Sequence, residues 1–180
     1  SQNDPRLPYY FQQLSGADPY VGSGINEDNA DASGFGDWVL ATGRSFPLLT
    51  YFEAKFIEAE AALRNNDPGT AASAYNEGVR ASVEFFTGSS APAQFINEYA
   101  SETESSIDME TIMTQKYIAM FTQPEVWADY RRTGYPDLTP DPRGSINSIP
   151  QRYPTALDER LYNENMESIT DLTTPVWWAE

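Results

Sequence analysis

The sequence contains no cysteine and no histidine among its 180 residues. Without cysteine, the chain has no disulfide framework, no thiolate nucleophile and no thiolate metal site. Without histidine, it has no Ser-His-Asp triad, no His-ligated zinc and no imidazole general base. Carboxylates, tyrosine, lysine and arginine are the residue types that remain for catalysis, so several common classes of enzyme site are excluded.

Basic residues are also scarce, since 11 Lys and Arg stand against 27 Asp and Glu, for a net charge of −16. Phosphate repels so acidic a surface, which argues against binding to nucleic acid or to anionic lipid. Nine of the cations are arginine and two are lysine. The excess of arginine over lysine favours stacked or bidentate contacts over a diffuse basic patch.

Long apolar runs are missing as well. No stretch approaches the roughly 20 apolar residues that span a bilayer, and the first residues lack a signal-peptide pattern. The chain opens with Ser1-Gln2-Asn3-Asp4-Pro5, and we interpret it as a cut or processed piece. Hydrophobic residues still make up 40% of the sequence, enough for the core of one globular domain or of part of one.

The chain divides into a loop-rich segment 1–45, a helical segment 46–134 and an irregular segment 135–180. Gly, Pro, Asn, Asp and aromatic residues fill the first segment without a helical or strand period. Prolines punctuate the third segment, which has room for one short helix around Leu157 and Leu161. Together the segments predict an all-α, mainly helical fold with long irregular loops.

Two helices are predicted at the start of the helical segment, because apolar residues recur there every three or four positions. The first would bury Leu49, Phe52, Phe56, Ala59 and Leu63. The second would bury Ala71, Tyr75, Val79, Val83 and Phe86, and would end near Gly88.

This helix pair is tetratricopeptide-like, because Ala59, Ala71 and Gly78 supply small residues where two such helices approach closely. A single repeat cannot bury its own apolar face. We therefore expect the first helix and the second helix to pack against an N-terminal part of the protein outside this sequence. The residues expected at that contact are Phe52, Phe56, Tyr75 and Val79.

Two more helices are predicted before residue 135. Ser106 or Asp108 can cap the first of them. Its buried stripe is expected to consist of Met109, Ile112, Met113, Tyr117, Met120 and Phe121. Pro124 suits the first turn of the other helix, which would stop at Gly134.

Several of these segments resemble the SusD/RagB family of Bacteroidetes outer-membrane lipoproteins. The helical runs Tyr51–Leu63 and Ile112–Phe121 are similar to two core helices of that family, and Glu125–Pro136 (EVWADYRRTGYP) is similar to its most recognisable motif. The opening Asp4–Pro8 and the closing Trp177-Trp178 also fit. Since members of the family are longer than this chain, the resemblance implies the C-terminal part of a single SusD-like domain.

The resemblance implies a binding protein at the cell surface rather than an enzyme. Family members capture oligosaccharide or polysaccharide and deliver it to a SusC-type TonB-dependent outer-membrane transporter, and a lipid on an upstream cysteine anchors them. Two alternatives stay open: a peptide-binding RagB-type protein, and a helical-repeat interaction module without a small ligand. An aromatic cluster with polar groups favours glycan, exposed strand-like backbone favours peptide, and a broad apolar patch favours a protein partner.

Sugar recognition needs aromatic platforms for pyranose faces and polar groups for hydroxyls. The loop from Tyr20 to Trp38 interleaves both kinds of residue. The candidate ligand-binding residues are Trp38, Tyr20, Phe35, Asp37 and Asn26. Trp38 is the first choice because of its large flat face, and a binding tryptophan should be exposed. The alternative is that these aromatic side chains only pack the loop.

The same loop suggests a calcium site. The run Asn29–Gly34 resembles the first half of an EF-hand loop, but Leu40 stands at the twelfth position and cannot ligate calcium. A looser calcium site formed by Asp28, Asp31 and Asp37 is one interpretation, and a solvated acidic loop is the other. No other cofactor is expected.

The tryptophans outside this loop are interpreted as architecture. Trp127 and Arg131 lie four positions apart on one helix and can stack, with Arg131 or Arg132 paired to a buried carboxylate. Trp177-Trp178 is expected to be a largely buried tail against the helix that carries Trp127. Paired carboxylates suit glycoside hydrolysis in principle, but with 27 acidic residues a pair arises by chance.

Overall fold

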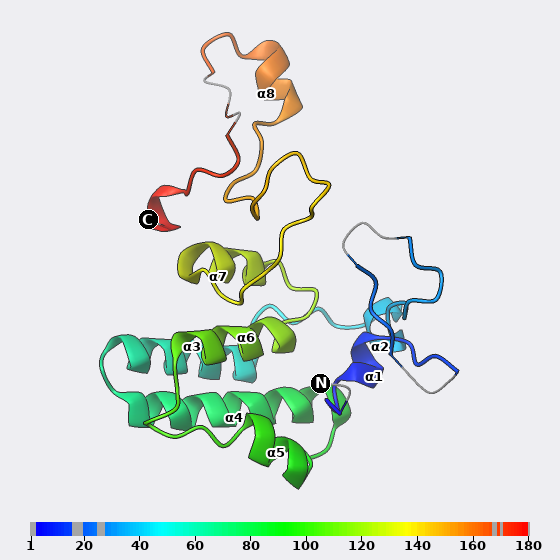
Figure 1. The fold of residues 1–180 in the computed structure, drawn as a ribbon, viewed down its shortest axis with the longest axis vertical. Coiled ribbons are helices and arrows are strands. Elements are labelled where there is room, and N and C mark those ends of the chain that lie inside the picture. Colours follow the sequence, from blue (N-terminus) through cyan, green and yellow to red (C-terminus); the bar gives the residue numbers. More distant parts are fainter. Residues whose placement is uncertain (1–2, 16–19, 25–27, 167–168, 170, 180) are drawn as a thin grey trace.

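A computed structural model describes residues 3–15, 20–24, 28–166, 169 and 171–179. These residues form helices and irregular segments, and the predicted all-α class is confirmed (Figure 1). The helices in chain order are α1 (Leu7–Tyr10), α2 (Asp37–Leu40), α3 (Tyr51–Arg64), α4 (Pro68–Thr87), α5 (Ala93–Tyr99), α6 (Met109–Ala119), α7 (Glu125–Thr133), α8 (Leu157–Tyr162) and the 3₁₀-helix η1 (Trp177–Ala179). Among them none is long and apolar enough to cross a membrane.

Helices α3 and α4 lie side by side, and α6 packs against both (Figure 1). A Cβ atom at Gly78 of α4 would lie only 3.4 Å from the ring of Phe56 on α3, so a small residue is required at this crossing. Ala59 and Ala71 are likewise fully buried. The predicted pairing of these two helices through small residues is confirmed.

The apolar face of this pair is buried within the chain itself. Phe52, Phe56, Tyr75 and Val79 are each at most 4% exposed. The expectation that they require an N-terminal part outside this sequence is therefore wrong. The physical reason is that α6 covers the pair and joins the same core, in which Ile112 is fully buried.

Capping residues fix where the paired helices begin and end. Thr50 and Glu53 form a reciprocal capping box at the start of α3. Asp67 caps α4, and Gly88 ends it with a φ of 68°, a left-handed conformation that glycine adopts without strain. Leu49 was expected to be buried in the first helix, but it precedes the Thr50 cap and is exposed.

Asp108 caps α6 by accepting a hydrogen bond of 2.8 Å from the backbone N–H of Thr111. The predicted stripe on α6 is only partly correct, because Tyr117 is exposed whereas Gln115 and Lys116 are buried. Those two polar side chains are buried because each has a partner: Gln115 accepts from Arg6, and Lys116 pairs with Asp129.

The loop-rich segment is tied to the helices by Arg6, whose side chain is 0% exposed. Its guanidinium pairs with Asp4 at 2.7 Å and donates to Ser82 Oγ on α4 at 2.9 Å and to Gln115 Oε1 on α6 at 3.1 Å. A buried charge with this many partners fixes the approach of its segment to the core. Part of the segment predicted as loop thereby joins the core, including the buried Tyr10 of α1.

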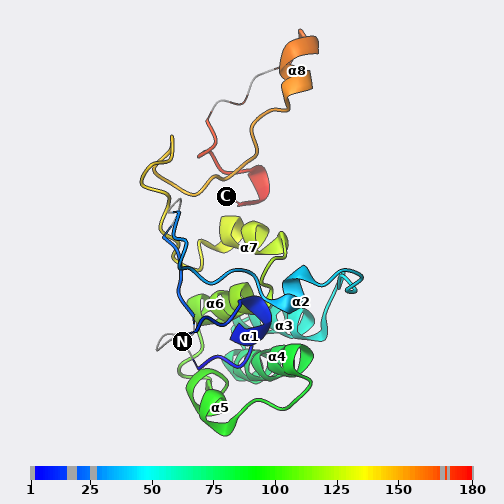
Figure 2. The same ribbon diagram turned by 90° about the vertical axis from the view of Figure 1, so that its right-hand side faces the viewer.

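Helix α7 connects the α3–α6 body to the C-terminal segment, which extends beyond it (Figure 2). The indole Nε1 of Trp127 donates to the carbonyl of Pro150 at 2.8 Å, and the Arg131 guanidinium lies 3.8 Å from the Trp127 ring centre. Arg132 pairs with the buried carboxylate of Glu60. The predicted stacking of Arg131 on Trp127 and the pairing of Arg132 with a buried carboxylate are confirmed.

The C-terminal tryptophans depart from expectation. Trp178 lies against α7, with Arg131 4.6 Å from its ring centre, but 37% of the residue is exposed and Trp177 is 84% exposed. The prediction that both are largely buried is wrong, and only the contact with the Trp127 helix is confirmed. The reason is that the short helix η1 contacts α7, where Trp178 reaches Arg131 while Trp177 stays exposed.

Candidate functional site

The loop from Tyr20 to Trp38 folds back onto the segment that follows α1. Val21 and Ser33 close the loop through two hydrogen bonds, of 2.8 Å and 3.1 Å. Phe11 and Phe35 form an antiparallel bridge, flanked by a bond from Gln12 N to Gly34 O and one from Gly36 N to Tyr10 O, each of 2.8 Å. These bonds hold the loop aromatics beside those of residues 9–11.

Gly36 is essential to this arrangement. A Cβ atom at this position would lie 2.6 Å from the carbonyl oxygen of Tyr9. Any side chain there would push the two segments apart, so the close approach depends on glycine.

The closed loop borders a pocket of about 520 Å³, here called the aromatic pocket. Its larger lining residues are Leu7, Phe11, Tyr20, Val21 and Phe35. Phe35 is 51% exposed. The rings of Phe11 and Phe35 rest on Phe121, at centroid distances of 5.0 Å and 6.1 Å. The core thus supports two exposed or half-exposed rings from behind, which is the geometry of a stacking platform.

A second hollow of about 420 Å³ shares Phe11 and Tyr20 with the aromatic pocket, and we call it the polar shelf. It brings in Gln12, Gln13 and Asp37. Amide and carboxylate groups therefore stand next to the aromatic rings, as recognition of hydroxyl groups requires.

The charge around both hollows is negative. No lysine or arginine lines either hollow within the described part of the chain, whereas Asp37 lines the shelf and Asp28 and Asp31 are exposed on the same loop. A neutral ligand meets no electrostatic penalty here, but an anionic one does.

Of the candidate residues taken from the sequence, Tyr20, Phe35 and Asp37 are brought together. Trp38 is not part of either hollow. It is half-buried, packs edge-on against Phe86 at 4.8 Å, and has the guanidinium of Arg44 4.0 Å from its ring centre. Asn26 lies outside the described residues.

The expectation that Trp38 is an exposed platform does not fit this position. Trp38 borders a different and smaller hollow, of about 120 Å³, between the α2–α3 connection and the end of α6. Its indole packs against the core, because it lies edge-on to Phe85 and Phe86 near the end of α4.

The calcium hypothesis gains no geometric support. Among the described residues, no three acidic side chains form a group that could hold a metal ion. Asp28, Asp31 and Asp37 are all exposed and are not gathered around one point. Calcium binding by these residues stays a prediction from the sequence.

The sequence pattern did not identify Phe11, Gln12 or Gln13 as site residues. The available signal was the aromatic run Tyr9-Tyr10-Phe11 directly after a proline, followed by two amide side chains. This run repeats the mixture of aromatic and polar residues in the 20–38 loop. Residues 9–13 and the 20–38 loop therefore have similar composition, and two such irregular segments can come together to form one binding surface.

Comparison with known proteins agrees with the fold. The chain matches the SusD-like family model described as "Starch-binding associating with outer membrane" over residues 1–154. No curated protein matches the chain. The matched range includes both hollows, the helix pair and α7, and it ends just before α8. The chain therefore belongs to the SusD-like family, whose members are described as starch-binding and as associated with the outer membrane.

Proposed function

We propose that this chain captures a neutral oligosaccharide or polysaccharide in the aromatic pocket and polar shelf and passes it to a SusC-type TonB-dependent transporter. In this proposal the protein is lipid-anchored at the outer face of the outer membrane and performs no catalysis itself. Sugar rings would stack on Tyr20 and Phe35, and Asp37, Gln12 and Gln13 would bond their hydroxyls. The starch-binding description of the family supports the ligand class.

The observation that carries this proposal is the shared border of the two hollows. Phe11 and Tyr20 line both of them, so an apolar ring platform and a row of amide and carboxylate groups are continuous. Oligosaccharides present the same combination, with apolar ring faces and polar hydroxyl edges.

The backbone argues against the peptide alternative. In the part of the chain that the structure describes, strand-like pairing is limited to the single bridge between Phe11 and Phe35. A peptide that binds by adding a strand needs a longer exposed edge. We therefore favour saccharide over peptide at this site.

A protein partner is supported by a separate surface. Several apolar side chains are exposed along the chain from the end of α2 to the start of α3, and we call them the apolar edge: Leu40, Phe46, Leu48, Leu49 and Tyr51. Contiguous exposed apolar groups of this kind mark protein interaction sites. We assign the transporter contact to the apolar edge. Leu48→Ser with Leu49→Ser should reduce co-purification with the transporter and leave starch binding unchanged, and Leu157→Ser with Leu161→Ser on the exposed face of α8 is the control.

Affinity electrophoresis in gels that contain starch or another neutral polysaccharide tests the glycan proposal. Tyr20→Ala and Phe35→Ala should each weaken retardation, by about tenfold in Kd if one stacking platform is lost. Tyr162→Ala removes an aromatic side chain of α8 that is more exposed than Tyr20 and Phe35, and this control should have no effect. Retardation that is equal in all four proteins would overturn the assignment of this site.

A further inference from the structure

A groove of about 690 Å³ runs between α3 and α7, away from the aromatic pocket. One face of α3 supplies Ile57, Ala61 and Arg64, and one face of α7 supplies Glu125 and Asp129. Trp178 of η1 also lines this α3–α7 groove. It has no lining residue in common with the aromatic pocket or the polar shelf.

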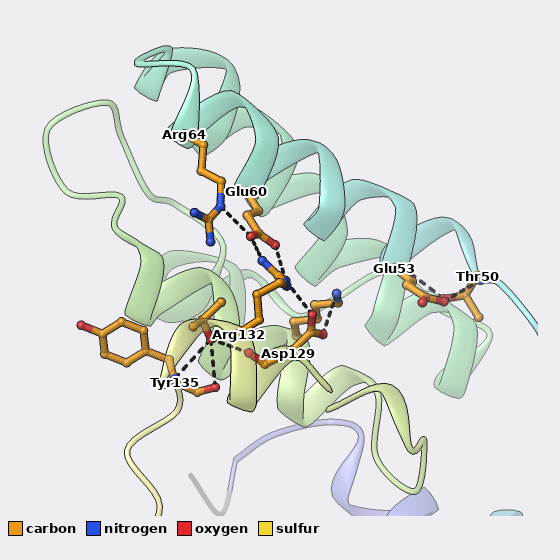
Figure 3. A network of polar contacts seen from close by, with 9 residues as sticks. Thr50, Glu53, Glu60, Arg64, Asp129, Arg132 and Tyr135 are labelled. Carbon is orange, nitrogen blue, oxygen red and sulfur yellow. Dashed lines mark hydrogen bonds and ion pairs between the residues drawn. The ribbon is translucent and has the colours of Figure 1, made fainter. Parts of the chain in front are cut away.

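The polar wall of the groove is held in place by paired charges (Figure 3). Glu60 accepts from Arg64 at 2.8 Å and from Arg132. Asp129 pairs with Lys116 at 2.7 Å and with Arg132 at 2.8 Å. Because these charges compensate one another, the wall offers fixed donors and acceptors without a strong net charge of either sign.

Two polar side chains at the rim are available to a ligand. Arg64 keeps 53% of its side chain exposed although it bonds Glu60. Glu125, the first residue of α7, is exposed and lines the groove. The Arg64 guanidinium can donate to sugar hydroxyls and the Glu125 carboxylate can accept from them, at two separate points along the groove.

Trp178 provides the apolar part. The Arg131 guanidinium lies over its ring at 4.6 Å and fixes the indole in place, while 37% of the residue stays exposed. An indole that is held but not buried, beside fixed donors and acceptors, can stack on the apolar face of a pyranose.

We infer that the α3–α7 groove is a second saccharide-binding site, in which Trp178 stacks on one sugar ring and Arg64 and Glu125 bond hydroxyls at other points along the saccharide. The inference takes its ligand class from the proposed function, but the site is separate. Two sites on one chain let a polysaccharide bind at two points, which raises its apparent affinity above that of a short oligosaccharide.

Fluorine NMR of protein labelled with 5-fluorotryptophan tests this inference, because the chain has four tryptophans and each gives its own signal. We expect maltoheptaose to shift the Trp178 signal saturably and to leave the Trp177 signal nearly unchanged. Trp177 is the internal control, since it is the more exposed indole and does not line the groove.

A variant that fills the groove from an exposed position tests the site without disturbing the folded core. Ala61 is an exposed position on α3 that lines the groove, so Ala61→Phe should block the site and abolish the Trp178 shift. Ala54→Phe places the same side chain at an exposed position of the same helix outside the groove lining, and the shift should persist.

The outcomes separate the two proposals. If maltoheptaose binds and Tyr20→Ala weakens binding, but the Trp178 signal never moves and Ala61→Phe has no effect, the second site is overturned and the proposed function stands. If the Trp178 shift survives in the Tyr20→Ala, Phe35→Ala double variant, the second site is supported. If maltoheptaose, cellohexaose and xylohexaose all fail to bind the chain, both proposals are overturned.

Discussion

Arg132 of α7 donates hydrogen bonds to both carboxylate oxygens of Glu60 on α3, although 72 positions separate the two residues. Glu60 is buried and also accepts from Arg64, and Arg132 also bonds Asp129. This contact joins the helix pair to the helix that carries the C-terminal segment.

Replacing Glu60 tests the strength of this connection. Glu60→Gln removes one charge of a largely buried pair and should lower the free energy of unfolding by about 2 kcal/mol in urea titrations. Glu58→Gln on the same helix breaks an exposed pair with Lys55 and should cost much less, because exposed ion pairs contribute little to stability. Equal losses in the two variants would contradict a special role for Glu60.

The same carboxylate predicts a pH dependence. Burial alone would raise the pKa of Glu60, but the hydrogen bonds from Arg132 and Arg64 hold this pKa below its ordinary value of 4.5. Folding therefore favours the ionised form of Glu60. The contribution of this carboxylate to the free energy of unfolding is complete above pH 4.5 and is lost as the pH falls through the lowered pKa. The stability difference between the unsubstituted chain and Glu60→Gln should shrink below pH 4.5, and a constant difference down to pH 3 would refute this.

Trp38 should behave as a packing residue. Its contacts with Phe86 and Arg44 predict that Trp38→Ala lowers the free energy of unfolding by about 2 kcal/mol, less than for a fully buried tryptophan. Starch binding measured on folded protein should be nearly unchanged. A variant with normal thermal stability and lost binding would instead make Trp38 a ligand contact.

Charge should govern ligand choice. Because the aromatic pocket and polar shelf carry acidic and no basic lining residues within the described chain, neutral polysaccharide should bind more tightly than a carboxymethylated form of the same polymer. Asp37→Asn should reduce the difference in affinity between the neutral and the carboxymethylated polymer, and added salt should reduce it as well. Isothermal titration with matched neutral and carboxymethylated starch measures it, and a preference for the anionic polymer would contradict the prediction.

Arg6 should be among the most sensitive positions in the chain. Arg6→Met removes a fully buried cation and deprives Asp4, Ser82 and Gln115 of their hydrogen bonds from the guanidinium, so we expect a loss of about 3–5 kcal/mol in the free energy of unfolding. The loss in the free energy of unfolding should be smaller for Arg6→Lys, which keeps the charge but lacks the planar guanidinium that reaches all three partners. Arg160→Met, an exposed arginine on α8, is the control in thermal unfolding followed by circular dichroism.

The helices could be predicted because their signals are local. Periodicity and capping residues located α3, α4 and α7 closely, since a helix is specified by residues three and four positions apart. The burial of Lys116 could not be predicted in this way, because it depends on Asp129 of the next helix. Leu49 and Tyr117 show the opposite error, because both were expected to be buried and are exposed. Helical periodicity cannot tell which apolar residues the neighbouring elements will cover.

The site could be predicted only in part. Composition indicated the 20–38 loop, and Tyr20, Phe35 and Asp37 do lie around adjoining hollows. The contribution of Phe11 depends on the bridge to Phe35, which joins segments 24 positions apart through backbone bonds that no periodicity encodes. Trp38 was misplaced because an aromatic residue in a loop can face either the core or solvent.

The position of Arg6 also sets an order of events for a chain that is made from its N-terminus onward. Its acceptor on α6, Gln115, follows it by 109 positions, so this arginine has no complete set of partners until α6 has left the ribosome. Residues 4–11 therefore lack this contact at a stage when α3 and α4 can already pair with each other. Contacts over such sequence separations slow folding, so this short stretch gives a chaperone or protease time to act before Arg6 is buried.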